Sequence, residues 1–339
     1  MYLPPTRRPS GTAALVVLLG VGACADPSAT TAPLAPRATS AQASTAPATS
    51  ASLTSEVQEY MAGRNRALAA TARVAVSKVE FLLAPNAAAA LGDGAGTVLA
   101  ADHHHRTGIR WVPRDPRRAG RTNVTYAVFE PLMAADAPTG FVTATGSVDA
   151  AAQTWNGVGC SGIRLEKRTL PAGFFPSLLL QPLGTALVPL TDVGVVGWLP
   201  SAVFTEHFPS GAQNILGVTW TYTWADANGD PTDIDHDGYD DEAYVEQWFQ
   251  NGGAGHITWS NAQTTAFDSE GYDAQFVVLH ELGHALGLAH FGRIVLDQKG
   301  ATRATPTAVM NGGAVTSLRA PLGSDVGGIC GLYAQWPTR

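Results

Sequence analysis

The feature that most constrains this chain is a set of three histidines and one glutamate near its C-terminal end. His280 and His284 are four residues apart, so on a helix their side chains project from one face and can bind one metal ion. Glu281 lies about a quarter turn from that face, where it can hold a water molecule instead of the ion. Gly287 is free to adopt positive φ and reverse the chain, which would bring His290 back as a third ligand. Three protein ligands leave one coordination position open, as is typical of catalytic zinc sites.

The residues around these histidines predict a helix. Asp273 is a candidate N-cap, and apolar residues recur at intervals of three or four positions beyond it, which predicts that one helix face is buried. These apolar positions are Phe276, Leu279, Leu282 and Leu286. The alternative is a helix whose histidines bind no metal. The glutamate, the glycine and the third histidine together favour the metal site.

The pattern His280-Glu281-x-x-His284-x-x-Gly287-x-x-His290 resembles the signature of the metzincin clan of zinc endopeptidases. The resemblance extends more loosely to the matrixin branch of that clan over residues 107–335, although Phe291 stands where matrixins carry serine. It implies that Met310 lies in a tight turn below the metal. It also implies that Asp325 braces that turn.

The resemblance further implies the fold and the activity. An α+β domain is expected, with a twisted, mostly parallel sheet that carries the active-site helix, and with a small irregular C-terminal part. The implied reaction is hydrolysis of a peptide bond in a protein or peptide substrate, with Glu281 as general base. Residues 216–224 alternate β-branched and aromatic side chains, and by resemblance they would form an edge strand that pairs with substrate. An interior strand is the alternative.

The N-terminal part of the chain predicts export. Residues 1–24 read as a lipoprotein-type signal peptide, in which Cys24 is lipidated and becomes the mature N-terminus. The expected location is therefore the cell envelope, with a lipid anchor as the only membrane attachment. An ordinary secretory signal is the alternative, and the protein would then be secreted. Residues 25–52 are rich in Ala, Thr, Ser and Pro and predict a disordered tether.

The rest of the 339-residue chain divides into two parts. Residues 53–106 are expected to form a helical pro-region or cover segment, and residues 107–339 the catalytic domain. Hydrophobic periodicity within that domain predicts a strand at 124–129, a helix at 145–158 and a strand at 163–167. The sequence also predicts two short buried strands, at 178–180 and 195–198.

The chain has three cysteines, and two remain when Cys24 is assigned to lipid. In an exported protein, Cys160 and Cys330 are then expected to form a disulfide bond. Two buried free thiols are the alternative.

An acidic segment predicts a second metal site. Asp233, Asp235, Asp237 and Asp241, with Gly238 at the turn, follow the first part of an EF-hand-like calcium loop. The glutamate expected at the end of such a loop is absent. A solvated acidic turn is the alternative to a calcium site.

Charge and composition limit the partners. The net charge of −7 and the lack of a basic stripe argue against nucleic acid as a partner, and a monomer is expected. One alternative function is a non-catalytic surface lipoprotein that uses the metzincin fold for binding or adhesion. A second alternative is a zinc hydrolase that acts on another type of bond.

Overall fold

The computed structural model describes residues 50–69, 73–85, 87, 108–129, 144–180, 190–251, 257–260, 271–296 and 301–338. All of them belong to the compact unit Ala46–Arg339. The predicted signal peptide, Cys24 and the tether up to residue 49 lie outside the described residues. Within the described residues, no helix is both long and apolar enough to cross a membrane.

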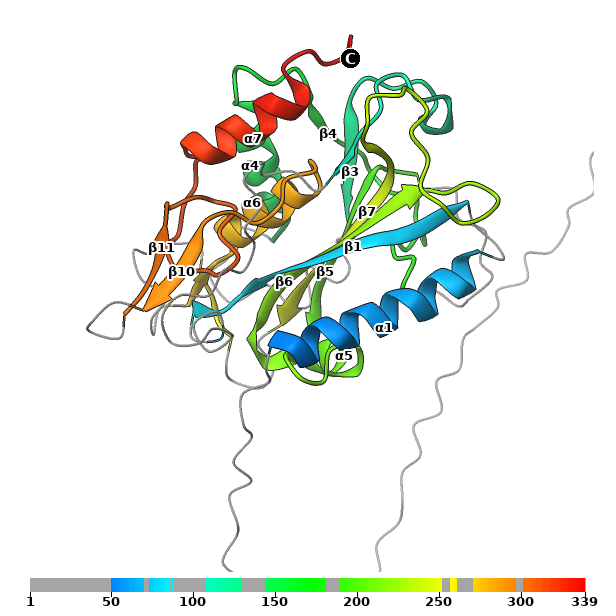
Figure 1. The fold of residues 1–339 in the computed structure, drawn as a ribbon. Helices are drawn as coiled ribbons and strands as arrows, with labels where there is room; N and C mark the ends of the chain where they lie inside the picture. Colours follow the sequence, from blue (N-terminus) through cyan, green and yellow to red (C-terminus); the bar gives the residue numbers. More distant parts are fainter. Residues whose placement is uncertain are drawn as a thin grey trace, which may run out of the picture. The chain divides into compact units, whose positions relative to one another are not determined.

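A central sheet of seven strands organises the described part of the chain (Figure 1). Its main path runs β1 (Val74–Leu83), β6 (Ile215–Trp224), β7 (Asp240–Asn251), β5 (Val193–Pro200), β3 (Val124–Val128) and β4 (Leu165–Lys167). The short strand β2 (Ile109–Arg110) pairs with β7. Strands β7, β5, β3 and β4 run parallel to one another, whereas β6 pairs antiparallel with β1 and β7. The predicted mixed α and β architecture with a mostly parallel sheet is confirmed.

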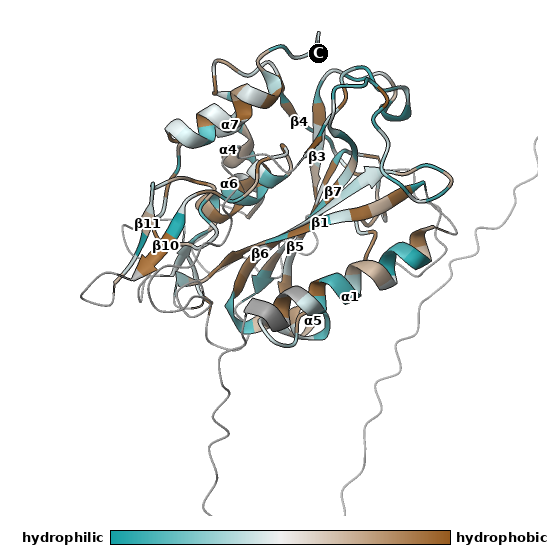
Figure 2. Cartoon of the chain, in the orientation of Figure 1, coloured by the Kyte–Doolittle hydropathy of each residue, from teal (hydrophilic) through white to brown (hydrophobic). Residues whose placement is uncertain are grey.

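Helices cover both faces of this sheet. One apolar cluster contains side chains from α4 (Ala144–Asn156), α6 (Ala274–His284) and α7 (Gly323–Tyr333), together with one sheet face. The opposite face packs against α1 (Ser50–Leu68) and α5 (Ser201–His207) in a second cluster. Figure 2 shows largely apolar strands between these layers, with both apolar and polar residues along α1. The two faces are therefore buried by different helices, as expected for a sheet with mostly parallel strands.

Smaller elements complete the fold. Strands β8 (Trp259–Ser260) and β9 (Tyr272–Asp273) pair in parallel, and β9 directly precedes α6. Strands β10 (Arg293–Leu296) and β11 (Thr302–Thr305) form an antiparallel pair after His290. Single 3₁₀ turns lie at η1 (Pro116–Arg118) and η2 (Ala212–Asn214).

Most of the predicted elements occur close to their expected positions. The strand predicted at 124–129 is β3, the helix at 145–158 is α4, and β4 occupies the second half of 163–167. The strand predicted at 195–198 lies within β5, whereas residues 178–180 form a bend and no strand. Helix α1 begins at Ser50, so it includes the last three residues of the predicted tether.

Two expectations about strands are wrong. Residues 53–106 are expected to be helical, but within them Val74–Leu83 form the strand β1, which pairs with β6 along its length. Strand β6 was expected to be an edge strand, and it is an interior strand between β1 and β7. The alternation in β6 shows that it belongs to a sheet, but alternation contains no information on whether a neighbour pairs with each edge.

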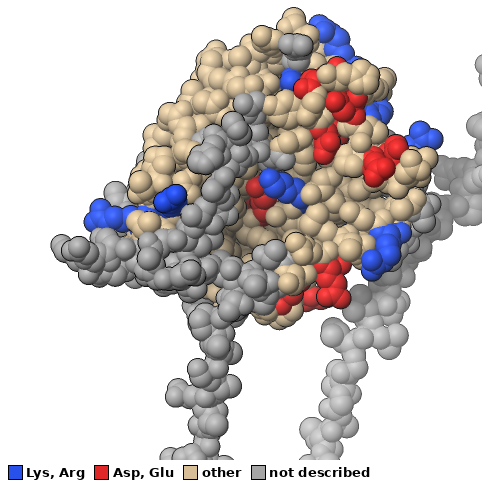
Figure 3. All heavy atoms as spheres, viewed as in Figure 1, with Lys and Arg blue, Asp and Glu red and all other residues tan. Residues whose placement is uncertain are grey.

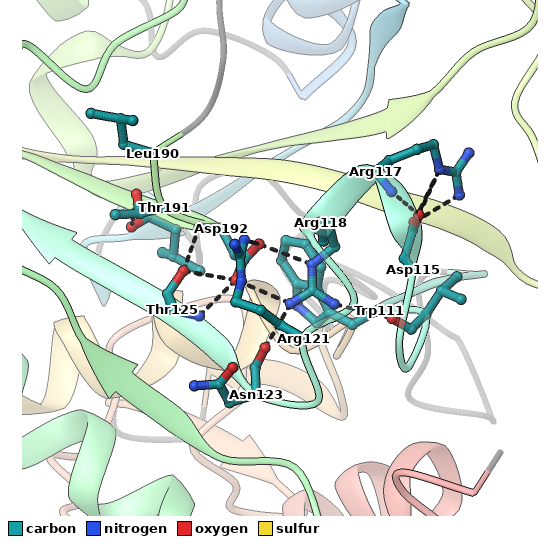
Figure 4. Close-up of polar contacts among 12 residues, drawn as sticks. Trp111, Asp115, Arg117, Arg118, Arg121, Asn123, Thr125, Leu190, Thr191 and Asp192 are labelled. Carbon is teal, nitrogen blue, oxygen red and sulfur yellow. Dashed lines mark hydrogen bonds and ion pairs between the residues drawn. The ribbon is translucent and has the colours of Figure 1, made fainter.

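An ion-pair network fastens the loop before β3 to the sheet (Figure 4). The guanidinium of Arg118 donates to both carboxylate oxygens of Asp192, at 2.9 and 3.0 Å, and Arg121 donates at 2.8 Å. Asp192 also accepts hydrogen bonds from the backbone N–H and the hydroxyl of Thr125. Arg118 lies 4.5 Å from the ring centroid of Trp111. The network joins the residues leading into β3 and β5.

A disulfide bond joins Cys160, in the loop after α4, to Cys330 in α7. It connects residues separated by 170 positions in the chain. Acidic and basic side chains are interspersed on the face shown in Figure 3.

Candidate metal centre

Helix α6 supplies two of the three histidines and begins at a strong cap. The Asp273 side chain accepts hydrogen bonds from the backbone N–H groups of Gln275 and Phe276 in the first turn of the helix. The same carboxylate accepts hydrogen bonds from Ser317 and Arg319. This fixes the start of α6 relative to the C-terminal part of the chain.

The three histidines converge on one point. The Nε2 atoms of His280 and His284 are 3.0 Å apart, and each lies 3.2 Å from Nε2 of His290. A tetrahedral zinc ion with Zn–N bonds of about 2.0–2.1 Å needs nitrogen atoms roughly 3.3 Å apart. The spacing therefore fits a zinc ion to within a few tenths of an ångström, and these three residues form a group able to hold a metal.

The other ring nitrogens fix the orientation of two imidazoles. His280 Nδ1 lies 2.7 Å from the carbonyl oxygen of Val309, and His284 Nδ1 lies 2.8 Å from that of Leu288. A carbonyl accepts only, so Nδ1 carries the hydrogen in both rings. The Nε2 lone pairs are then free to bind a cation, the usual arrangement for histidine ligands.

Gly287 permits the chain reversal that brings His290 to the other two histidines. Its φ is 77°, a value that side chains rarely adopt, and a Cβ at this position would lie 2.7 Å from the carbonyl oxygen of Ile109. The indole of Trp111 donates to the carbonyl oxygen of Ala285, just after the last turn of α6. Both features favour a sharp end to the helix.

Met310 lies beneath the centre in a turn held by Asp325. The Asp325 carboxylate accepts hydrogen bonds from the backbone N–H groups of Val309 and Met310, at 2.9 and 3.1 Å. The Met310 side chain packs so closely on Gly283 that a Cβ there would overlap its sulfur.

Glu281 lies beside the histidine group and faces β6. Its Oε2 atom accepts a hydrogen bond of 2.6 Å from the hydroxyl of Thr219, which in turn accepts one from Gln247. Its Oε1 atom approaches Gly217 so closely that a Cβ there would lie 2.6 Å away. Burial raises the pKa of Glu281 to about 7, against the opposing effects of His284 and the Thr219 hydroxyl.

A second carboxylate, Glu80 in β1, contacts the centre. Its Oε2 atom lies 3.0 Å from Nδ1 of His284, and both side chains are almost fully buried. Burial alone would raise the pKa of Glu80, but the charge of His284, with help from Lys78, lowers it to about 2. Burial alone would lower the pKa of His284. The charge of Glu80 and its hydrogen bond act in the opposite direction, and the pKa of His284 is raised above its ordinary value. Glu80 thus favours a hydrogen on Nδ1 of His284.

The other two imidazoles are held neutral. Burial, reinforced by the neighbouring histidines, lowers the pKa of His280 well below its ordinary value and that of His290 to about 3. Neutral imidazole is the form that binds a metal ion.

Three of the four predicted calcium ligands lie together. Asp233, Asp235 and Asp237 each place a carboxylate oxygen within 4.8 Å of the others. Asp241 does not join them, because its carboxylate binds Arg117 at 2.7 Å and accepts a hydrogen bond from Thr232. Burial, and then the negative charge of Asp237, raises the pKa of Asp235, a cost that a bound cation would relieve.

Sequence reasoning missed the residues that reach this centre from distant strands. Thr219 and Gln247 lie on β6 and β7, and Glu80 lies on β1. Strand alternation places Thr219 on the same sheet face as Gly217, but it does not show that α6 covers that face. No short motif marks Glu80.

Comparison of the sequence with protein-family models and with curated proteins finds no match.

Proposed function

We propose that this chain is an exported zinc-dependent endopeptidase of the metzincin clan, similar to matrixins. The observation that carries the proposal is the convergence of three Nε2 atoms at 3.0–3.2 Å with the Glu281 carboxylate beside them. The motif around them and the Asp325-braced turn at Met310 support the assignment to this clan.

The roles of the residues follow from their positions. His280, His284 and His290 hold the ion through Nε2, and burial keeps the rings of His280 and His290 neutral, as that task requires. A zinc ion bound there would supply a Lewis acid that polarises a carbonyl group and acidifies a water molecule. Glu281 takes the proton from this water and passes it to the leaving amine, with its raised pKa suited to both steps. Thr219 orients the carboxylate through its hydroxyl.

The remaining parts of the proposal concern location, substrate and calcium. Lipidation at Cys24 would anchor the protein in the cell envelope, and an ordinary signal peptide would lead to secretion. The substrate class is a protein or peptide, acted on by a monomer. The group Asp233, Asp235 and Asp237 is proposed to bind calcium as a structural ion.

Two measurements on the purified chain test the catalytic proposal. One zinc ion per chain is expected by elemental analysis, with loss of zinc in His280→Ala. The control His207→Ala should keep zinc, because His207 packs against Tyr60 and Trp248, away from the centre. Hydrolysis of unstructured casein should stop with a zinc chelator and in Glu281→Gln, which should still bind zinc.

The alternative is a non-catalytic surface lipoprotein that uses this fold for binding or adhesion. A protein that only binds a partner does not need a carboxylate that Thr219 orients beside a metal ion with a free coordination position. Undiminished casein hydrolysis by Glu281→Gln would contradict the role of Glu281. Bound zinc without hydrolysis of casein would favour the binding protein.

A further inference from the structure

A pocket separate from the metal centre is formed where β2, the acidic segment before β7 and the C-terminal end of α7 meet. Its volume is about 350 Å³, which is within the range of small-molecule sites. The residues that line it include Arg110 of β2, Asp237, Tyr239, the last turn of α7, Ala334 and Gln335. None of the three histidines of the metal centre is among the described residues that line this pocket.

The side chain of Arg110 is fixed in this pocket by several contacts. The residue is 7% exposed, and its Nη1 atom donates to Oδ2 of Asp237 at 2.7 Å. The central carbon of its guanidinium lies 5.5 Å from the ring centroid of Tyr333 and 5.9 Å from that of Tyr239. Its other two nitrogens, Nε and Nη2, have no hydrogen-bond partner among the described residues. Arg110 is therefore a buried cation with two unused donors, and such donors are costly to leave unpaired.

The unused edge of Arg110 is the edge that binds carboxylates elsewhere in this chain. Nε and Nη2 lie on the same side of the planar guanidinium, where they can donate side by side to the two oxygens of one carboxylate. Three other arginines use these two atoms in this way, and each of them binds one aspartate. The pairs are Arg117 with Asp115, Arg118 with Asp192 and Arg319 with Asp273. Arg110 has the same fork, but no carboxylate of the described residues occupies it.

The neighbouring Asp237 does not fill this role. It contacts Arg110 at Nη1, and its Oδ1 atom accepts a hydrogen bond of 2.9 Å from the backbone N–H of Tyr239. It also belongs to the group that is proposed to bind calcium, so a bound ion would share its charge. The fork of Arg110 therefore remains available to a carboxylate from outside the chain.

The charges around the pocket favour a carboxylate over a phosphate group. The last turn of α7 lines the pocket, and the C-terminal end of a helix carries partial negative charge. The carboxylate of Asp237 adds a full negative charge beside Arg110. Both charges repel a phosphate group, which carries nearly two negative charges, more strongly than a carboxylate, which carries one.

We propose that this pocket binds a small molecule that carries a carboxylate group, whose two oxygens accept hydrogen bonds from Nε and Nη2 of Arg110. Both nitrogens are closed off from solvent, so the wall of the pocket has to move to admit the ligand. Ala334 and Gln335, which belong to this wall, are exposed and follow the end of α7. Once formed, the contact is shielded from water, which strengthens it. The site does not depend on the proposed peptidase function.

The test follows the arginine Nε–H groups of the full chain by NMR, at constant calcium concentration and ionic strength. With acetate as the probe, one Nε–H resonance should shift and saturate, with a Kd on the order of 10 mM. Arg110→Lys keeps the charge but removes the fork, so both this resonance and the binding of acetate should be lost. The control Arg114→Lys should keep both, because it changes an exposed arginine that donates to the carbonyl oxygen of Pro337.

A second variant leaves the buried arginine in place. Ala334→Phe puts a large side chain at an exposed position of the pocket wall, so it should leave the fold intact and weaken acetate binding by about 10-fold or more. Unchanged binding in this variant would place the site elsewhere and overturn the inference, as would the lack of a saturable shift below about 100 mM acetate. Equal binding of chloride would indicate an adventitious ion only. Tighter binding of phosphate than of acetate would contradict the carboxylate.

Discussion

The hydroxyl oxygen of Thr219 lies 2.6 Å from Oε2 of Glu281, so a side chain on β6 orients the carboxylate that stands beside the histidine group. Thr219 is fully buried, and Gln247 donates to its oxygen from β7 at 3.2 Å. The hydroxyl hydrogen is thereby directed toward Glu281. The central sheet thus fixes the position of the proposed base.

Thr219→Val keeps the shape of the side chain and removes this hydrogen bond. Loss of such an orienting partner typically lowers activity by about 10–100-fold. We expect a fall of that size in kcat for peptide hydrolysis, with little change in KM and with zinc retained. The matched control is Thr221→Val, two residues along the same strand and equally buried, which should keep activity within about twofold. Equal losses in both variants would show a general effect on the strand.

The part of the centre that is local in sequence could be predicted from the sequence. His280, Glu281 and His284 have positions set by helix geometry, and Gly287 marks the end of that helix because only glycine adopts its φ easily. His290 follows from that reversal.

The contacts made by β1 could not be predicted in this way. Its apolar residues do not predict a strand, because register shifts against β6 between Val76 and Lys78 and between Leu82 and Leu83 interrupt the alternation typical of a strand. Glu80 and Leu82 reach α6 only through this long-range pairing. Whether a strand such as β6 is interior or at an edge also depends on such a partner.

Asp192 is predicted to be important for stability. Burial alone would raise its pKa, but the ion pairs with Arg118 and Arg121 and the bond from Thr125 lower it. Asp192→Asn leaves buried Arg118 without its counter-ion, and breaking a buried pair in this way costs about 3–5 kcal/mol. The folded-state pKa is below that of the unfolded chain, so this stability is present above about pH 4 and is lost as the pH falls through the folded-state pKa.

Denaturant unfolding at pH 7 and pH 3 measures this difference. The control is Asp149→Asn, which breaks an exposed pair with Lys167 and should cost less than about 1 kcal/mol. A cost for Asp192→Asn that is equally small at pH 7 would contradict the role of the network.

The calcium proposal predicts a stability change that is independent of zinc. Removing calcium with a chelator selective over zinc should lower the Tm, because the three carboxylates would then repel one another. Asp235→Asn should abolish this calcium-dependent shift. Asp226→Asn, in the neighbouring turn, should retain it, because the Asp226 carboxylate binds backbone N–H groups within its own turn. A Tm that does not respond to calcium in the unmodified chain would indicate a solvated acidic turn.

Glu246 on β7 should make stability fall as the pH rises. Burial raises its pKa to about 7, although Ser177, Trp248 and the backbone of Leu178 donate to its carboxylate. The folded-state pKa is above that of the unfolded chain. The contribution is therefore fully present below about pH 4.5 and is lost as the pH rises through 7, by an amount on the order of 3 kcal/mol. Glu246→Gln should remove this dependence, so its stability relative to the unmodified chain should be higher at pH 8 than at pH 5. Urea unfolding at both values measures the change, with the exposed Glu166→Gln as control. A difference between Glu246→Gln and the unmodified chain that is the same at both values would show that Glu246 does not titrate in this range.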